Sequence, residues 1–434
     1  VAQAPAAAPA EAKHLSLQDA IRTSLENNLQ VCIAREGREA TQAGVSIAQG
    51  AFDWDLTGNL SYSRLDSASS SAIYKGGPVS KTESTTFQRN LSMGVAKPFE
   101  WGGNLQINYS PAYSFTRGVV ASTDSRFTTT YPYSGSLAAT YTQSLLKNFG
   151  RDVTGSQLIV ARKGALAADY LYQKAVIDLV AATEGYYWDV VYAQRNLENT
   201  RIALSLAEKQ LKENRIRVDV GTMAPIEVTS AEAAVAQQEQ NIISAEAQLL
   251  NAKDTLIRAL YPTSERPAGL ELTDAPTLDH IKLDEGAAEK MALERRVELK
   301  SAKLDLESKQ VLEKAAQNRL KPQLDAFATY NGAADNYTAL GPVNGDLSGT
   351  KYPGYTVGLT FSMPFANHAA KGNLAQARAN ARQSSYTLHD QELGIILEVR
   401  QAIRNIDAGE KGVKAAEKTR IFREKDLEAE QKKF

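Results

Sequence analysis

The chain has 434 residues, a formal net charge of −1 and a single cysteine, Cys32. A near-neutral charge gives no sign of a nucleic-acid surface, and a lone cysteine excludes an intrachain disulfide. No apolar run reaches the ~18–20 residues of a membrane-spanning helix, which leaves a soluble protein or a membrane β-barrel, whose strands give only a weak signal. The apolar neighbours of Cys32 predict that its side chain is buried.

Residues 1–14 at the amino terminus are rich in alanine and proline. They lack both the basic region and the apolar core of a signal peptide. We therefore expect a flexible terminus of the mature protein, left after a leader has been removed.

Five segments are predicted to be helices because they lack internal proline and are rich in Ala, Leu, Gln, Glu, Lys and Arg. The predicted helices are 15–51, 152–219, 225–260, 284–318 and 370–434. Within the long helix 152–219, apolar residues recur every seven positions, a spacing typical of coiled coils. These residues are Leu197, Leu204, Leu211 and Val218.

Two windows, 52–145 and 322–365, are rich in Ser, Thr, Gly, Asn and Tyr, and in both of them apolar residues alternate with polar ones. A period of two residues predicts strands with one apolar face, and segments of about ten residues match a tilted strand that crosses a bilayer. The predicted strands are 53–65, 86–97, 104–117, 133–145, 322–333 and 352–365.

The succession of helices and strands occurs twice in the chain. Residues 24–26 align with 292–294 at an offset of about 268 positions, and residues 200–202 align with 419–421 at about 219. The smaller second offset means that the first repeat carries about 50 extra residues in its strand zone. The predicted organisation is repeat one over 15–261, an inter-repeat linker over 262–283 and repeat two over 284–434.

The most specific motif follows the long helix and consists of Val220, Gly221, Thr222, Met223, Ala224, Pro225, Ile226, Glu227 and Val228. It resembles the Val-Gly-Thr turn of the outer membrane efflux protein family, the TolC-like outer-membrane channels. An Ala/Gln-rich helix follows it, as is typical of that family. Residues 141–146 and 362–365 are similar to the family's strand-to-helix junctions. The resemblance covers essentially the whole chain after Ala12.

The resemblance implies an α+β membrane protein. Its tandem helix–strand–strand–helix repeats are expected to form a trimeric transmembrane β-barrel, continued by a long periplasmic α-helical (coiled-coil) barrel. The expected function is the outer-membrane exit duct of a tripartite efflux or type I secretion system in a Gram-negative bacterium. The expected partners are two further copies of the chain, a periplasmic adaptor (membrane fusion) protein, an inner-membrane pump and outer-membrane lipid. The cargo remains open among drugs, metal ions, polypeptides and lipids.

Two other functions compete with this one. A periplasmic adaptor of an export complex also has a long helical hairpin, but it would insert one hairpin into a small β-domain. A structural coiled-coil protein would leave the alternating Ser- and Tyr-rich windows without a purpose.

Two groups of residues are the predicted functional sites. Gly221 permits the left-handed conformation that ends a helix, and Pro225 suits the first turn of the next helix. By resemblance, the tip that contacts the adaptor is Val220, Gly221, Thr222, Met223, Ala224 and Pro225. Aromatic residues near strand ends are expected to lie at the membrane interface. They are Phe52, Trp54, Phe99, Trp101, Phe115 and Phe149.

No pattern points to an enzyme, a metal site or a cofactor. The four histidines are isolated, with no helical pair and no cysteine neighbour. Carboxylates alternate with Lys and Arg, as on solvated helix faces, so no acid/base pair can be selected. Residues 150–156 look superficially like a phosphate-binding loop, but the second glycine is not followed by lysine, which predicts a turn.

Two further expectations concern size. The second repeat stops at Phe434, the counterpart of Arg215, so we expect a longer native chain with a second return helix. The family's usual four strands per chain imply twelve in a trimer. This chain offers six, because a short turn at 98–103 separates two longer connections, and this favours eighteen. The alternative is that 86–117 forms an extracellular flap.

Overall fold

A computed structural model describes residues 13–71, 80–120, 124–261, 270–278, 283–336, 338–348 and 353–433. The chain divides into two compact units. The helical unit comprises residues 1–40, 166–301 and 389–434, and the sheet unit comprises 41–165 and 302–388. Most of the predicted terminus 1–14 and much of the predicted linker 262–283 lie outside the described residues. Within the described residues, no helix combines the length and the apolar character needed to cross a membrane.

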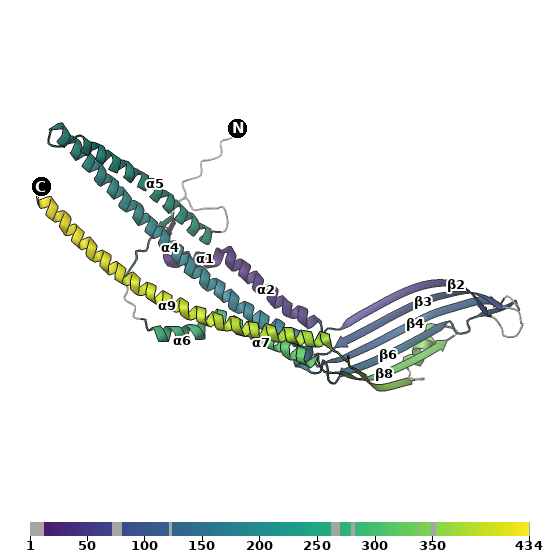
Figure 1. Ribbon diagram of the computed structural model, residues 1–434. Helices are drawn as coiled ribbons and strands as arrows, with labels where there is room; N and C mark the ends of the chain where they lie inside the picture. Colours follow the sequence, from purple (N-terminus) through teal and green to yellow (C-terminus); the bar gives the residue numbers. More distant parts are fainter. Residues whose placement is uncertain are drawn as a thin grey trace, which may run out of the picture. The chain divides into compact units, whose positions relative to one another are not determined.

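An antiparallel hairpin of α4 and α5 is the largest feature of the helical unit (Figure 1). The elements wholly in this unit are β1 (Lys13–Leu15), α1 (Leu17–Asn27), α5 (Ile226–Leu260), β7 (Leu270–Leu272) and α6 (Glu285–Arg295). The helices shared with the sheet unit are α2 (Leu29–Gly50), α4 (Ser156–Asp219), α7 (Val297–Asn318) and α9 (His368–Lys433).

The core of the helical unit surrounds Tyr187 of α4, whose side chain is fully buried. Its hydroxyl accepts a hydrogen bond from the Asp274 N–H (3.2 Å) and donates one to the Leu15 carbonyl (3.1 Å). Parallel pairing of β1 with β7 brings these two segments together. The apolar residues packed in this core are Leu15, Ala20, Val190, Val191, Leu256, Leu260 and Leu270. Tyr187 therefore joins the first strand of the chain to the segment that follows α5.

The helices predicted over 15–51 and 284–318 are each interrupted once, at equivalent positions of the two repeats. Asn28 separates α1 from α2 and has an extended backbone (φ −69°, ψ 127°). Its side chain donates to the Ala259 carbonyl (2.9 Å) and accepts from the Gln30 N–H (2.8 Å), and this bonding competes with helix continuation. Arg296 separates α6 from α7 with a similar backbone (φ −59°, ψ 124°).

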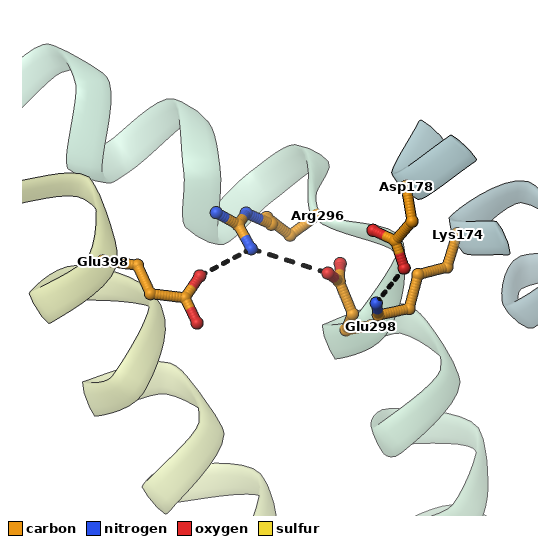
Figure 2. A network of polar contacts seen from close by, with 5 residues as sticks. All are labelled: Lys174, Asp178, Arg296, Glu298 and Glu398. Atoms are coloured by element: carbon orange, nitrogen blue, oxygen red, sulfur yellow. Dashed lines mark hydrogen bonds and ion pairs between the residues drawn. The ribbon is translucent and has the colours of Figure 1, made fainter. Parts of the chain in front are cut away.

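Arg296 lies in a network of charged side chains within the helical unit (Figure 2). Its guanidinium is 2.9 Å from Glu398 of α9 and 3.5 Å from Glu298. On α4, a hydrogen bond to Asp178 raises the pKa of Lys174. Partly exposed pairs of this kind contribute about 0–1 kcal/mol each, so they orient α9 against α6 and α7 more than they stabilise the unit.

The sheet unit is built on one antiparallel sheet with strand order β2-β3-β4-β6-β8-β9, and a short strand, β5, pairs with β4. The strands are β2 (Asp55–Ser71), β3 (Ser80–Pro98), β4 (Gly103–Val120), β5 (Ser125–Thr128), β6 (Tyr133–Ser144), β8 (Gln323–Asn336) and β9 (Pro353–Ser362). Pairing of β6 with β8 joins the two repeats. The sequence did not predict β5, because four residues are too few to display a period.

The two faces of this sheet differ in chemistry. The register places Leu60, Leu91 and Pro111 on one face, which we call the apolar face. Its other members include Leu56, Met93, Val95, Ile107, Tyr109, Leu137, Val357 and Leu359. The opposite, polar face carries hydroxyl pairs such as Thr86 with Thr116 (2.9 Å). Alternation in the sequence therefore corresponds to a true difference between the faces.

A helix, α8 (Leu340–Ser348), packs on the apolar face and lies between the predicted strands 322–333 and 352–365, where no helix was predicted. Val343 is fully buried and Leu347 nearly so. A Cβ at Gly135 would lie 2.7 Å from Val343 Cγ1, so glycine permits this close approach. Two glycines and a proline give α8 a poor helix propensity, and its tertiary contacts stabilise it instead.

The other predicted helices differ in small ways from the observed ones. The predicted helix 152–219 is divided by Gly155 into α3 (Arg151–Thr154) and α4. The predicted helices 225–260 and 370–434 correspond to α5 and α9. Cys32 is half-buried, not buried, because it lies on α2 beside the exposed Leu29 and Ile33.

We predict that Tyr187→Phe destabilises the helical unit by about 1–3 kcal/mol, because the Leu15 carbonyl and the Asp274 N–H lose a buried partner. Burial raises the pKa of Tyr187. The unfolded tyrosine therefore ionises first, and the stability that the hydroxyl contributes is complete below pH about 10 and declines above it. Thermal unfolding of both proteins checks this: the difference in melting temperature should be constant from pH 7 to 9 and shrink towards pH 11. A difference that grows above pH 10 would contradict it.

Candidate functional site

The turn between α4 and α5 forms the tip of the hairpin. Gly221 has φ 79°, its N–H donates to the Val218 carbonyl (2.9 Å), and the Thr222 N–H donates to the Arg217 carbonyl (2.8 Å). This pair of bonds is a Schellman motif, and the positive φ explains why the position is glycine. Pro225 stands immediately before α5, where its missing N–H removes no helical hydrogen bond.

The tip presents its side chains to solvent. Val220, Thr222, Ala224 and Pro225 are exposed, and Met223 is half-buried. A Cβ at Gly221 would meet no atom within 4 Å. The structure therefore places all the residues of the predicted tip together on one open surface.

Below the tip, α4 and α5 pack along a seam with the alternating three- and four-residue spacing of a coiled coil. On α4 the buried or half-buried positions are Ala193, Leu197, Thr200, Leu204, Ala207, Leu211, Asn214 and Val218. On α5 they are Val228, Ala231, Val235, Gln238, Ile242, Ala245, Leu249, Ala252, Leu256 and Ala259. The four heptad residues predicted from the sequence all belong to this seam.

Asn214 is a buried polar residue within the seam. Its side-chain oxygen accepts a hydrogen bond from Gln210 (2.7 Å), and its amide nitrogen donates to the Glu227 carbonyl of α5 (3.3 Å). An ion pair between Arg215 and Glu232 (2.7 Å) lies close by. A polar residue bonded across a coiled-coil seam favours one register of the two helices.

The hairpin also carries large apolar side chains outside its seam. Ile202, Leu206, Ile243 and Leu250 are each more than half exposed. Ile202 and Leu206 line a hollow of roughly 540 Å³ together with Leu249 of α5. A surface helix with one buried stripe normally shows polar residues elsewhere, so this second stripe indicates contact with another helix.

Several aromatic residues lie at the end of the sheet where β2 begins and β3 ends. We call this the near end of the sheet and the opposite end the far end. The rings of Phe99 and Trp101 stack at 4.5 Å, and the Trp101 indole N–H donates to the Tyr141 hydroxyl (3.2 Å). Lys97 lies 5.6 Å from the ring of Trp54. Among the predicted interface aromatics, Phe52, Trp54, Phe99, Trp101 and Phe149 fall in the turns at this end of the strands.

The sixth predicted aromatic, Phe115, lies towards the far end of the sheet, where it pairs with Phe87. Tyrosines that the sequence did not single out accompany it. The rings of Tyr113 and Tyr133 are 5.1 Å apart, and Arg89 lies 5.8 Å from that of Tyr113. Strand alternation shows which face a residue occupies, but only the register shows which residues share a height.

On the apolar face of β3, a charged side chain lies at each end of a run of apolar residues. Lys97 and Arg89 share this face, and the apolar residues Leu91, Met93 and Val95 alternate between them. Eight residues span roughly 27 Å along a strand, or about 20 Å in height at the tilt of strands in membrane barrels. The apolar band of such barrels is about 25 Å tall, which is similar.

Within the described part of the chain, no cluster of three or more His, Cys, Asp or Glu side chains is placed to hold a metal ion. His14 lies 3.3 Å from Glu271, and His389 lies 3.5 Å from Glu392. His280 falls outside the described residues. Gly150 (φ 96°) forms a turn before the short helix α3, as predicted for that segment.

The chain is similar to known outer-membrane proteins in sequence and in fold. The chain is 26% identical over 284 residues to the outer membrane protein TolC of Escherichia coli (strain K12). That match covers 63% of this chain and 56% of TolC, so the chain spans a little over half the length of this relative.

Solved structures that share the fold include two outer-membrane proteins. One is the outer membrane protein VceC of Vibrio cholerae, with a TM-score of 0.60, 15% identity, and 90% of this chain and 79% of that chain covered. The other is the MtrE outer membrane channel of Neisseria gonorrhoeae, with a TM-score of 0.55, 16% identity, and 92% and 74% covered. The model of the family described as outer membrane efflux protein matches residues 106–260 and 289–434. Since these residues make up more than two thirds of the chain, the protein belongs to the outer membrane efflux protein family.

Proposed function

We propose that this protein is the outer-membrane exit duct of a tripartite efflux or type I secretion system in a Gram-negative bacterium. It conducts substrates passively, with no chemistry and no cofactor of its own. One observation carries the proposal: the sheet has an apolar face, a polar face and two edge strands, β2 and β9, each paired on one side only among the described residues. Such a sheet suits a wall between lipid and water.

Closure of this wall requires further copies of the chain. A membrane tolerates no open strand edge, because lipid cannot hydrogen-bond the free backbone groups. We propose a homotrimer in which β9 of each copy pairs with β2 of the next. The pairing of β3 with β4 along nearly their whole length within the same sheet supports six strands per chain in the wall and eighteen in the trimer. A barrel of 16–18 strands is wide enough for an aqueous channel.

The hairpin of α4 and α5 is the proposed docking element for the periplasmic adaptor. Its tip is exposed, and its second apolar stripe supports lateral contacts with other helices of the trimer. An inner-membrane pump would be the third component. The alternative, that this chain is itself an adaptor, has less support, because an adaptor needs no sheet with one face of this apolar character.

Mass measurement in detergent checks the assembly. We expect three copies per particle, because one chain leaves the edges of β2 and β9 unpaired. The partner edge can be tested directly by Val357→Pro on β9, with Val357→Ala as the matched control, because Thr356 faces Thr329 of β8 and the N–H of Val357 points to the free edge. Proline removes a backbone donor and should reduce the trimer, whereas alanine keeps the ladder. A stable monomer with an intact sheet would overturn the proposal.

Protease protection in native membranes checks the strand number. The connections after β2 and β4 are long, and the turn from Pro98 to Gly103 is short, so membrane barrels would place the former outside the cell and the latter in the periplasm. Protease added to whole cells should cut within 72–79 or 121–132 and leave 91–109 intact. Ready cleavage between Leu91 and Tyr109 from outside would show that β3 and β4 form a flap above a twelve-stranded barrel.

Substitution at the tip checks the docking element. We expect Gly221→Leu to abolish export while trimer mass and membrane insertion stay unchanged, because it adds bulk and a strained positive φ only at the tip. Gly221→Asn tolerates the left-handed conformation and Thr222→Ala removes only the hydroxyl bond to Arg217, so both should retain most export. Normal export by Gly221→Leu would mean that the tip is only a turn.

A further inference from the structure

Arginines gather on the apolar face of the sheet beyond its apolar band. Arg64 and Arg117 lie 5.6 and 5.7 Å from the ring of Phe87, on either side of it. Arg89 lies 5.8 Å from the ring of Tyr113. The register places these arginines on the same face as Leu60 and Leu91. Their guanidinium groups therefore form a cluster immediately beyond the apolar residues along the strands.

This arginine cluster carries an excess of positive charge. In the far parts of the described strands, over 62–71, 80–89, 113–120 and 125–128, the acidic residues are Asp66 and Glu83. Asp66 pairs with Arg64 (3.1 Å), and Glu83 pairs with Lys81 (2.7 Å). The basic residues in the same ranges are Arg64, Lys81, Arg89, Arg117 and Arg126. Basic residues thus outnumber acidic ones by five to two in these ranges, and Arg89, Arg117 and Arg126 are exposed. Asp66 and Glu83 line the same hollow as Arg117 and Arg126 and offset part of this charge.

An apolar groove adjoins the cluster. It encloses roughly 390 Å³ between the sheet and α8. Its lining residues are Leu60, Arg89, Leu91, Pro111, Ala112, Tyr113, Tyr133 and Leu340. Val343 and Leu347 pack α8 against the sheet, and the Tyr109 hydroxyl donates a hydrogen bond to Asn344 (2.5 Å). These contacts hold α8 in place as one side of the groove. Arg89 therefore belongs to an otherwise mostly apolar cavity.

We propose that this groove and the arginine cluster bind a lipid with a net anionic phosphate headgroup in the outer leaflet of the membrane. The inference rests on the proposed function, which places the apolar face against lipid. Guanidinium groups bind phosphate oxygens through paired, charge-assisted hydrogen bonds, and Leu60, Leu91 and Pro111 offer an apolar floor for an acyl chain. At the edge of the apolar band an arginine is much less costly than at the centre of the bilayer.

Two other occupants fit less well. A free phosphate ion would use the arginines but would leave the apolar floor and the tyrosines uncovered. A protein partner would need to reach a face that the proposed function turns towards lipid. The combination of a cationic rim and an apolar groove is complementary to a molecule with an anionic head and a hydrocarbon tail.

Native mass spectrometry of the detergent-purified, full-length trimer tests the proposal, with dioleoyl phosphatidate and dioleoyl phosphatidylcholine as probes. The wild-type protein should retain phosphatidate in preference to phosphatidylcholine. The double variant Arg89→Gln/Arg117→Gln should weaken phosphatidate binding by about 10–100-fold, which corresponds to one or two lost phosphate contacts. Arg35→Gln, an exposed arginine of α2 in the helical unit, is the matched control and should bind like the wild type.

The outcomes are distinct. Equal binding of phosphatidate by the double variant, or equal binding of the two lipids by the wild type, would overturn the proposal. Displacement of phosphatidate by equimolar inorganic phosphate would also overturn it, because it would reveal a free-anion site. Channel conductance of the wild type and the double variant in planar bilayers distinguishes failure of the lipid site from failure of the proposed duct. A conducting trimer without lipid preference refutes only the lipid site, whereas a protein that never inserts refutes the duct itself.

Discussion

The backbone of the two edge strands sets the main constraint on this molecule. Among the described residues, β2 and β9 pair on one side only, and every long strand between them pairs on both. Water can satisfy such free N–H and C=O groups, but hydrocarbon cannot, at a cost of several kcal/mol for each group. The two edges come from different repeats, so they become edges of one sheet only once β6 has paired with β8. Whatever closes this sheet also fixes how many helical units stand together.

Internal repetition explains why the two halves resemble each other in outline and differ in chemistry. The helix at the start of each repeat is interrupted at the equivalent residue, Asn28 in the first and Arg296 in the second. Asn28 bonds to a backbone carbonyl of α5, whereas Arg296 forms an ion pair with Glu398 of α9. Both repeats thus have a bend at this position, and the residue at the bend contacts a different partner in each repeat.

Local chemistry made much of this architecture predictable. Proline-free stretches predicted the long helices, and alternation predicted the six long strands, because both signals reflect the backbone itself. The turn at the tip could be predicted because glycine readily adopts the positive φ that ends a helix there. The interruption at Asn28 and the helix α8 depend on contacts with distant residues, such as the Ala259 carbonyl and Gly135, which no local pattern contains. The tyrosines at the far end were missed for the same reason, since their common height follows from register.

The buried Asn214 has a consequence for how the hairpin can move. Sliding α4 past α5 by one heptad would separate the asparagine from the Glu227 carbonyl and bury its amide against apolar neighbours. That penalty opposes any ratchet-like displacement along the seam. Rotation of both helices together as one rigid body leaves the hydrogen bond between Asn214 and the Glu227 carbonyl intact, so it carries no free-energy penalty at this position. A force applied at the tip would therefore travel along the hairpin as a rigid rotation and would not dissipate through slippage between its helices.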